Sequence, residues 1–390
     1  MAKQVNVGLI GYSFMGKAHS HAFKDMSFFF PEAAAHPVMK AICGRNRDNV
    51  KAAAATFGWE GYETDWKKLI KREDIDLIDV STPGDSHAEI AIAAAEAGKH
   101  VFCEKPLANT LAEARAMAAA VKKAKVKSMV AYNYRRVPAV ALAKQLIDEG
   151  RIGTIYHWRA VYLQDWIMDP NFPLVWRLQK EKAGSGPHGD LNAHIIDLAR
   201  YLVGDIAEVV GMDETFIKER PIVDDINAAL GASSGKAKKK GKVTVDDATL
   251  FLARFNNGAL GSFEATRFAG GRRNGNRFEI NGSKGSIAFN LEKMNELQYF
   301  DRSDESHLQG FREIIVGEGA HPYMSHWWPP GHIIGWEHTF VHEIYDLMQA
   351  IGGKNKNLHP DFEEGVKDQA VLEAVSESIK NRSWIKVADM

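Results

Sequence analysis

The first residue in this chain whose position suggests chemistry is a lysine at the end of an apolar run. Val101 to Cys103 is a short apolar segment, and Glu104, Lys105 and Pro106 follow it directly. The proline disfavours helical backbone at Lys105 and keeps that residue extended. On its own the motif is more typical of a surface salt bridge than of a catalytic lysine. The choice between these two interpretations depends on the rest of the sequence.

A second group of titratable residues follows a glycine loop, Gly184 to Gly189. Asp190, His194 and Asp197 are spaced so that a helix places all three on one face. Oxidation of an alcohol by hydride transfer requires a group that accepts the hydroxyl proton. Histidine is the usual choice, and a neighbouring lysine or carboxylate tunes its pKa. The alternative is structural, with Asp190 as a helix cap and His194 as a core histidine satisfied by Asp197.

The start of the chain has the pattern of a dinucleotide-binding turn. The apolar run Val5 to Ile10 is followed by Gly11 to Gly16 and then by a helical segment. In such a turn the glycines allow a sharp bend and close packing, and the helix offers N–H groups to a pyrophosphate. Ser13 stands where the fingerprint has glycine, and its hydroxyl can donate to a phosphate oxygen. We expect Gly11, Ser13, Phe14 and Met15 at the cofactor, although a simple strand-to-helix turn gives the same pattern.

The residues after the second predicted strand bear on the choice between NAD and NADP. Gly44, Arg45 and Asn46 follow Val38 to Cys43, at the place where an NAD site usually has an acidic residue. Arg45 and Asn46 suit a 2′-phosphate, so the sequence leans toward NADP and leaves NAD open.

The strands that follow alternate with helices, which predicts a doubly wound parallel sheet over residues 1–133. Ligands of such a sheet bind at the carboxyl ends of its strands. Ser81, Thr82 and Pro83 come directly after Ile75 to Val80 and belong at that edge. His87 begins the next helix, where it either contacts the cofactor ribose or caps its own backbone. Glu104 and Lys105 then lie toward the nicotinamide end.

Residues 134–390 read as a second, α+β domain with a large and mostly antiparallel sheet. Apolar runs with period-two alternation are separated by turn residues, as between the strands on either side of Asn256 to Gly258. The predicted strands are Ile155 to Tyr162, Ala207 to Asp213, Asp247 to Phe255, Ala259 to Ala265, Arg277 to Asn281 and Ser286 to Asn290. We expect the lysine- and glycine-rich segment 231–242 to be a solvated loop.

Composition limits the function further. The chain has 390 residues, of which 45% are hydrophobic and 25% charged, with a formal net charge of −1. These values are typical of a two-domain globular protein and give no electrostatic footprint for nucleic acid or a membrane. The two cysteines, Cys43 and Cys103, lack metal-ligand spacing, so we expect reduced thiols in a cytoplasmic protein and no metal.

Taken together, Gly11 to Gly16, Glu104 to Pro106, and Asp190 with His194 resemble the Gfo/Idh/MocA oxidoreductases over about residues 5 to 385. Within that family, Tyr162 to Trp166, Trp176 with Arg177, and Arg200 to Gly204 resemble the sugar 3-dehydrogenases. The resemblance implies a Rossmann domain, an open-faced sheet domain that assembles the protein as a tetramer or dimer, and oxidation of a ring hydroxyl. The substrate classes are a sugar, an anhydrosugar, a glycoside or a cyclic polyol, possibly oxidised at C3.

The resemblance also implies roles for individual residues. Lys105 and His194 handle the proton, Asp190 positions the substrate or supports His194, and Glu104 organises the lysine beside the cofactor. Further expected cofactor contacts are Trp176 and Arg177, and further expected substrate contacts are Asn133, Tyr134, Gln164, Asp165, Trp166 and Trp336. Two other functions stay open: glycoside cleavage with tightly bound NAD in a transient oxidation, and non-catalytic sensing of a dinucleotide.

Overall fold

The computed structural model describes residues 3–223, 239–355 and 357–390. It separates into two compact units, which are described one at a time. Unit 1 contains Met1–Pro138 and Gly317–Lys367, and unit 2 contains Ala139–Val316 and Asp368–Met390. The sequence interpretation assigned all of 134–390 to the second domain, whereas in the structure residues 317–367 pack with the amino-terminal unit. Within the predicted loop 231–242, residues 231–238 lie outside the described part of the chain.

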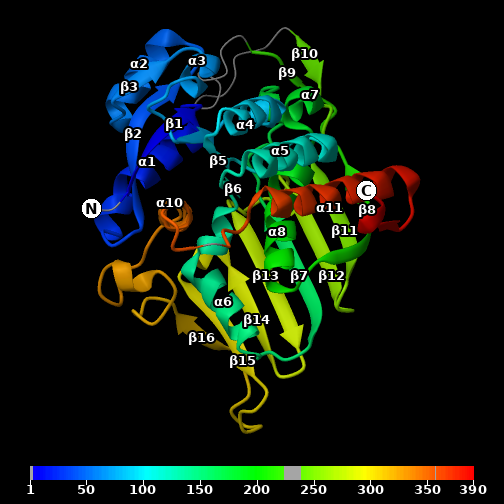
Figure 1. The fold of residues 1–390 in the computed structure, drawn as a ribbon. Helices are drawn as coiled ribbons and strands as arrows, with labels where there is room; N and C mark the ends of the chain where they lie inside the picture. The colour runs from blue at the N-terminus through cyan, green and yellow to red at the C-terminus, as the bar shows by residue number, and fades with distance from the viewer. Residues whose placement is uncertain (1–2, 224–238, 356) are drawn as a thin grey trace. The chain divides into compact units, whose positions relative to one another are not determined.

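Unit 1 is built on a six-stranded sheet with the order β3-β2-β1-β4-β5-β6 (Figure 1). All neighbouring strands are parallel, and the order reverses between β1 and β4, as in a doubly wound Rossmann fold. The predicted fold is confirmed. The strands are β1 (Lys3–Ile10), β2 (Ala35–Cys43), β3 (Gly61–Glu63), β4 (Leu77–Val80), β5 (His100–Cys103) and β6 (Ser128–Val130).

The helices of unit 1 pack their apolar sides onto this sheet and onto each other. They are α1 (Phe14–Phe29), α2 (Arg47–Phe57), α3 (Trp66–Ile70), α4 (His87–Glu96), α5 (Leu111–Ala124) and α10 (His338–Ile351). In α1 the buried residues Ala18, Ala22 and Met26 recur at helical spacing. Helix α10 packs against α1, which explains why its segment joins unit 1. The Gln349 side chain of α10 also accepts a hydrogen bond from the Ala34 N–H at 2.9 Å.

Unit 2 contains a nine-stranded sheet with the order β16-β15-β14-β13-β7-β12-β11-β8-β17. β7 and β12 pair in parallel and the other neighbours are antiparallel. All six predicted strands are present. The strands are β7 (Ile155–Leu163), β8 (Ile206–Glu214), β11 (Ala248–Phe255), β12 (Leu260–Thr266), β13 (Gly275–Gly282), β14 (Gly285–Asn290), β15 (Glu296–Asp301), β16 (Arg312–Ile315) and β17 (Ile385–Lys386).

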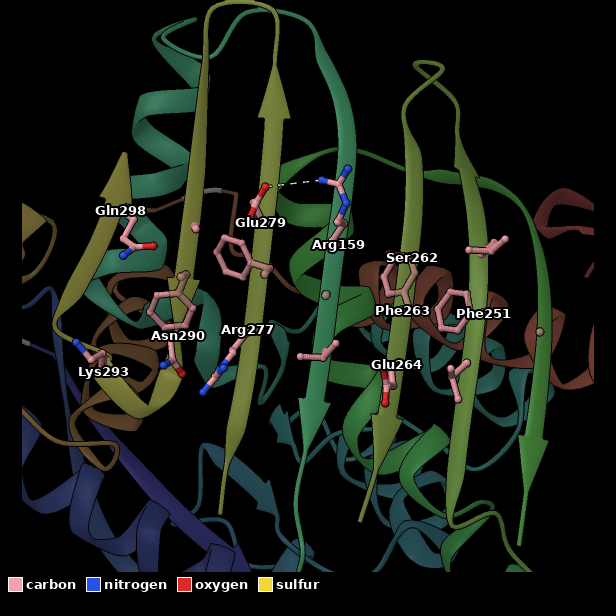
Figure 2. Close-up of a pocket in the computed structure, with 18 of the residues that line it drawn as sticks. Arg159, Phe251, Ser262, Phe263, Glu264, Arg277, Glu279, Asn290, Lys293 and Gln298 are labelled. Atoms are coloured by element: carbon pink, nitrogen blue, oxygen red, sulfur yellow. Dashed lines mark ion pairs between the residues drawn. The ribbon is translucent and has the colours of Figure 1, made fainter. Parts of the chain in front are cut away.

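The two faces of the nine-stranded sheet differ. Alternate residues such as Trp158, Phe251 and Phe278 are buried on one face, the face that carries Tyr162 and helix α8 (Ala193–Leu202). The opposite, open face forms a groove of about 920 Å³ (Figure 2). Exposed residues of that face include Met212, Leu250 and Leu252. None of the residues predicted for the active site lines this groove.

The remaining elements are short or lie at the edges. β9 (Glu219–Pro221) and β10 (Lys240–Lys242) form a two-stranded ribbon, so the end of the predicted loop 231–242 is a strand. The other helices are α6 (Pro138–Asp148), α7 (Lys180–Ala183) and α11 (Phe362–Asn381). No helix in the described ranges combines the length and the hydropathy that crossing a membrane requires.

Candidate active site

The glycine turn of unit 1 has the close contacts that a dinucleotide site needs. Gly11 has a φ of +109°, and a Cβ there would lie 2.5 Å from the Ser81 carbonyl oxygen. A Cβ on Gly16 would lie 2.2 Å from the Gly11 carbonyl oxygen. Ser13 instead has a φ of −75°, which any residue adopts. The departure from the glycine fingerprint at Ser13 therefore carries no backbone strain.

The start of α1 suits an anion. No side chain caps the helix, and its first turn contains no acidic residue, so its first N–H groups remain available for a phosphate. Together with the glycine contacts, this turn fits the pyrophosphate of a dinucleotide. The Phe14 ring at the helix start is 65% exposed and stacks on Trp336 at 5.5 Å. Met15 is partly buried beside it.

The residues predicted for an NADP site, Gly44, Arg45 and Asn46, follow β2. A Cβ at Gly44 would lie 2.1 Å from the Tyr12 ring, so no side chain fits there without displacing the tyrosine. The Asn46 side-chain oxygen accepts a hydrogen bond from the Asn49 N–H at 3.0 Å and caps α2. The cap uses the side-chain oxygen, whereas a phosphate would be contacted by the side-chain amide nitrogen, which donates. Arg45 and Asn46 are both exposed.

The ends of β4 and β5 bring the predicted loop residues to one edge of the sheet. Ser81, Thr82 and Pro83 follow β4, and Glu104 and Lys105 follow its neighbour β5. The Glu104 N–H continues the ladder by donating to the Val80 carbonyl at 2.9 Å. Parallel neighbours end on the same side, which explains why distant sequence positions gather here.

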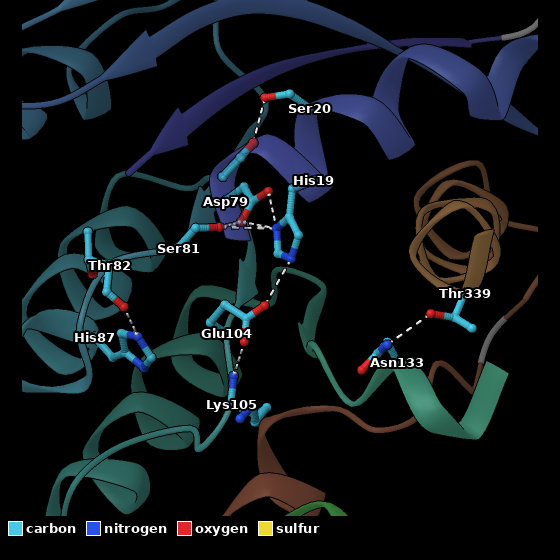
Figure 3. A network of polar contacts seen from close by, with 11 residues as sticks. His19, Ser20, Asp79, Ser81, Thr82, His87, Glu104, Lys105, Asn133 and Thr339 are labelled. Carbon is cyan, nitrogen blue, oxygen red and sulfur yellow. Dashed lines mark hydrogen bonds and ion pairs between the residues drawn. The ribbon is translucent and has the colours of Figure 1, made fainter. Parts of the chain in front are cut away.

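Glu104 is turned into the protein. Its side chain is 5% exposed, and one carboxylate oxygen contacts His19 Nε2 at 3.0 Å while the other accepts the Lys105 N–H at 3.0 Å (Figure 3). Glu104 thus contacts the Lys105 backbone, and both its carboxylate oxygens contact protein groups. Lys105 itself is partly exposed.

His87 takes neither of its two predicted roles. The residue is 1% exposed, and its Nε2 lies 2.8 Å from the Thr82 carbonyl oxygen while its Nδ1 lies 3.1 Å from that of Pro106. It therefore joins the loop after β4 to the loop after β5. Both ring nitrogens face the backbone, which leaves neither directed at a cofactor.

Asn133 and Tyr134 also lie in the interior. They are 3% and 4% exposed, at the start of a short 3₁₀ turn, Asn133–Arg136. The Asn133 amide donates to the Thr339 hydroxyl at 2.8 Å, which ties the turn to α10 (Figure 3). The predicted substrate contact of Asn133 is thus replaced, at its amide nitrogen, by a contact within unit 1.

In unit 2 the glycine loop leads through a π-helical turn, His188–Asn192, into α8. The sequence predicted a regular helix here. The turn is held by Asp246, whose carboxylate accepts the N–H groups of Gly186 at 2.6 Å and His188 at 2.8 Å. A Cβ on Gly186 would lie 1.9 Å from the Asp246 carbonyl oxygen, so only glycine allows this approach.

Asp190 and His194 stand in an ordered polar setting. Arg267, 1% exposed, donates to the Asp190 carboxylate at 2.5 Å. His194 is 5% exposed, and its ring centroid lies 5.8 Å from that of Tyr162. Neither the π-helical turn nor α8 has a side-chain cap. The structural alternative for Asp190, a helix cap, is therefore not what the structure contains.

A chain of hydrogen bonds connects the residues at the end of β7. Trp166 Nε1 donates to the Gln164 oxygen at 2.8 Å, and the Gln164 amide donates to Asn274 Oδ1 at 3.0 Å. The Tyr162 hydroxyl donates to the same Asn274 oxygen at 2.8 Å. Arg267 lies over the Trp166 ring at 5.1 Å. Arg267 connects these hydrogen-bonded residues to Asp190. We call the following set the helix group: Tyr162, Gln164, Trp166, Asp190, His194, Arg267 and Asn274.

Three further predicted contacts, Asp165, Trp176 and Arg177, have partners outside the helix group. Asp165 accepts hydrogen bonds from Arg273 at 3.0 Å and from the Gly271 N–H at 3.1 Å. Its carboxylate therefore holds a loop, where the sequence interpretation placed a substrate contact. Trp176 and Arg177 form a stacked pair, with the guanidinium 4.4 Å from the ring centroid.

The sequence interpretation did not identify Arg267, Asn274, His19 or Asp79. Arg267 directly follows β12 and Asn274 directly precedes β13, and only strand pairing brings them to β7. Asp79 did carry a signal, because a carboxylate inside the apolar run Ile75 to Val80 needs a buried partner.

Comparison with known proteins places this geometry in a family. Residues 5–132 match "Oxidoreductase family, NAD-binding Rossmann fold", and residues 140–288 match "GFO/IDH/MocA C-terminal domain". A levoglucosan dehydrogenase of Pseudarthrobacter phenanthrenivorans is 48% identical over 386 residues, 99% of this chain and 98% of its own. The chain belongs to the Gfo/Idh/MocA oxidoreductase family.

Comparison with solved structures supports the same family. An oxidoreductase domain protein from Kribbella flavida is 53% identical with a TM-score of 0.93, covering 99% of this chain and 100% of its own. The complex of levoglucosan dehydrogenase with NADH and levoglucosan is 47% identical with a TM-score of 0.92, covering 98% and 99%. This member of the family is accordingly a dehydrogenase with an NAD-binding Rossmann domain. The lean toward NADP finds no support.

Proposed function

We propose that the chain is an NAD-dependent dehydrogenase that oxidises a ring hydroxyl of a sugar, with anhydrosugars such as levoglucosan as the first candidates and C3 as the carbon oxidised. The observation that carries the proposal is the helix group. It combines a histidine, a carboxylate fixed by a buried arginine, and an indole beside amide groups. Polar groups with an aromatic platform suit a hydroxyl-rich ring.

The reaction removes a hydride from the ring carbon and a proton from its hydroxyl oxygen. NAD, when bound, supplies the hydride acceptor. The protein must supply the proton acceptor, and we assign this to His194 with Lys105, as the motif match to the family suggests. Asp190 accepts a substrate hydroxyl or orients His194. Arg267 pairs with Asp190, and an ionised carboxylate accepts hydrogen bonds only, so Asp190 is suited to accept from a hydroxyl.

NAD is the proposed cofactor. The complexes of the related levoglucosan dehydrogenase hold NADH, and residues 5–132 of this chain match an NAD-binding Rossmann family. The test is the rate of sugar oxidation with each cofactor at equal concentration. Higher kcat/KM with NAD supports the proposal, and higher kcat/KM with NADP contradicts it.

The central experiment measures nicotinamide absorbance with a panel of anhydrosugars, sugars, glycosides and inositols. We expect Lys105→Ala and His194→Ala to lose about 100- to 10,000-fold in kcat, since proton transfer by a positioned group contributes on the order of 10²–10⁴. Cofactor binding, followed by NADH fluorescence, should change little. Lys123→Ala and His307→Ala, at exposed positions, are matched controls.

The same experiment separates the alternatives. Full activity of either site variant overturns the role assigned to that residue. Product formation without release of free NADH identifies the glycoside-cleaving alternative, and NADH binding with no turnover of any substrate identifies a dinucleotide sensor.

We further propose that the protein works in the cytoplasm and self-associates through the open face of its nine-stranded sheet. Cys43 and Cys103 are both free and buried, which suits a reducing compartment. The open face exposes Met212, Leu250 and Leu252, and contiguous exposed apolar surface commonly marks a protein contact. Two or four copies are expected from the resemblance to the family.

A further inference from the structure

His19 is a buried histidine that the proposed chemistry does not use. It lies in α1, three residues after Gly16, and is 0% exposed. Its Nδ1 lies 2.8 Å from Asp79 Oδ2, and its Nε2 lies 3.0 Å from Glu104 Oε1 (Figure 3). The ring therefore spans the gap between a residue near the end of β4 and a residue just after β5.

The contacts identify the ring as a donor on both sides. A carboxylate accepts hydrogen bonds only, so an imidazole placed between two carboxylates donates through both nitrogens as an imidazolium. Burial alone lowers the pKa of His19, but the charges and hydrogen bonds of Asp79 and Glu104 outweigh it and raise the pKa to about 10. The rings of Phe102 and Phe340, at 5.0 and 5.4 Å, enclose it.

Glu104 connects the His19 ring directly to Lys105. Glu104 uses one oxygen for His19 and the other for the Lys105 N–H, 3.0 Å away. On the other side, Asp79 Oδ1 accepts the Ser81 hydroxyl at 3.1 Å. The His19 ring is thus connected through Asp79 to Ser81, after β4, and through Glu104 to Lys105, after β5.

We propose that His19 is a positioning residue for Lys105: its imidazolium fixes the Glu104 carboxylate, which in turn fixes the backbone from which the lysine side chain extends. His19 itself touches neither the substrate nor the cofactor in this scheme. The inference rests on the proposed function of Lys105. It goes beyond that function because it assigns a role in catalysis to a side chain buried in the core.

The two sides of the His19 ring have different consequences. The Glu104 side leads to Lys105, and the Asp79 side leads to Ser81. Loss of either carboxylate removes a buried charge partner and lowers stability. Only loss of the Glu104 carboxylate releases Lys105. The Glu104 and Asp79 variants should therefore differ more in kcat than in melting temperature.

The experiment compares His19→Gln, Glu104→Gln, the double variant and Asp79→Asn. His21→Gln is the matched control, because His21 lies on the same helix, is partly exposed and pairs with Asp25 at 3.1 Å. For each protein kcat, the KM for the sugar, NADH affinity and melting temperature are measured. Lys105→Ala is measured alongside.

We expect His19→Gln and Glu104→Gln each to lower kcat about 100-fold, the loss typical of a reactive group displaced by about 1 Å, with NADH affinity nearly unchanged. Because both act through one contact, the double variant should lose no more than either single variant. Asp79→Asn should lose melting temperature but retain more of kcat. His21→Gln should match the wild type.

The outcomes are distinguishable. Full activity of Lys105→Ala overturns the proposed function. An inactive Lys105→Ala together with a wild-type kcat in His19→Gln overturns the inference alone, as does an Asp79→Asn loss of kcat equal to that of Glu104→Gln. If His19→Gln does not fold, Glu104→Gln decides: a fall in kcat supports the inference, and a wild-type kcat overturns it.

Discussion

Arg267 shows how a single buried side chain can set the character of the helix group. Its guanidinium is 1% exposed, donates to Asp190, and lies over the Trp166 ring. A buried arginine needs a carboxylate partner, and Asp190 is that partner. The pair keeps a carboxylate with a fixed direction beside His194, which a solvated aspartate would not have.

The first prediction concerns this ion pair. Arg267→Met keeps much of the side-chain volume but leaves Asp190 without its donor, so we expect kcat/KM for the sugar to fall about 10- to 100-fold. NADH affinity should stay close to that of the wild type. Arg273→Met is the matched control, since Arg273 pairs with Asp165 and its side chain is 85% exposed. An equal fall in both variants would argue against a specific role for Arg267.

At the scale of elements, α10 anchors the aromatic segment that precedes it. His342 is fully buried; its Nε2 accepts the Trp327 N–H at 2.7 Å and its Nδ1 donates to the Arg136 carbonyl at 2.8 Å. Tyr323 stacks on the same ring at 4.3 Å. Residues 321–338 are rich in histidine and aromatic side chains without a periodic pattern, and in the structure two of them, Tyr323 and Trp327, contact His342.

The second prediction follows from the charge state of His342. Burial lowers its pKa to about 3, below the ordinary value of about 6.5. A lowered pKa means that the unfolded chain takes up the proton first, so this histidine's contribution to stability is complete above about pH 6.5 and is lost as pH falls toward about 3.

The measurement is chemical unfolding of the wild type and His342→Gln between pH 7.5 and 4. We expect the stability advantage of the wild type to shrink as pH falls, by on the order of a few kcal/mol. Hydrogen exchange should rise first in residues 317–337. His332→Gln, at an exposed position, should follow the wild type throughout, and a pH-independent difference for His342→Gln would contradict the prediction.

At the scale of the whole molecule, none of the residues assigned to chemistry lines the groove on the nine-stranded sheet. It combines apolar side chains with charged ones such as Arg159 and Glu279, which pair at 3.7 Å (Figure 2). A sheet face that mixes exposed leucines with charged side chains is better suited to another protein surface than to a small sugar.

The third prediction tests this assignment. Leu252, on β11, is 53% exposed and lines the groove, so Leu252→Arg places a charge on the open face. We expect the variant to sediment as a smaller species than the wild type in analytical ultracentrifugation. Ala55→Arg, at an exposed position of α2, is the control. An unchanged sedimentation coefficient in Leu252→Arg would exclude this face as the principal contact.

Much of the fold could be predicted because it depends on local patterns. Strand and helix periodicity identified the parallel sheet and six strands of unit 2, and the glycine turn was visible because Gly11 and Gly16 sit at fixed offsets from a strand. β15, β16 and β17 were not predicted. β16 and β17 are the two edge strands of the sheet and have no buried residue, which weakens the alternation that marks a strand. Residues 317–367 were assigned to the other domain because chain order carries no record of which sheet a later helix packs against.

The sequence by itself determined which residue types stand at the ends of strands and beside glycines, and hence the family, the class of reaction and the candidates Lys105, Asp190 and His194. Only the tertiary structure decided the partners of those residues. Arg267 reaches Asp190 across 77 positions and His19 reaches Glu104 across 85. Such contacts depend on strand order and helix packing, which bring together side chains that no local spacing relates.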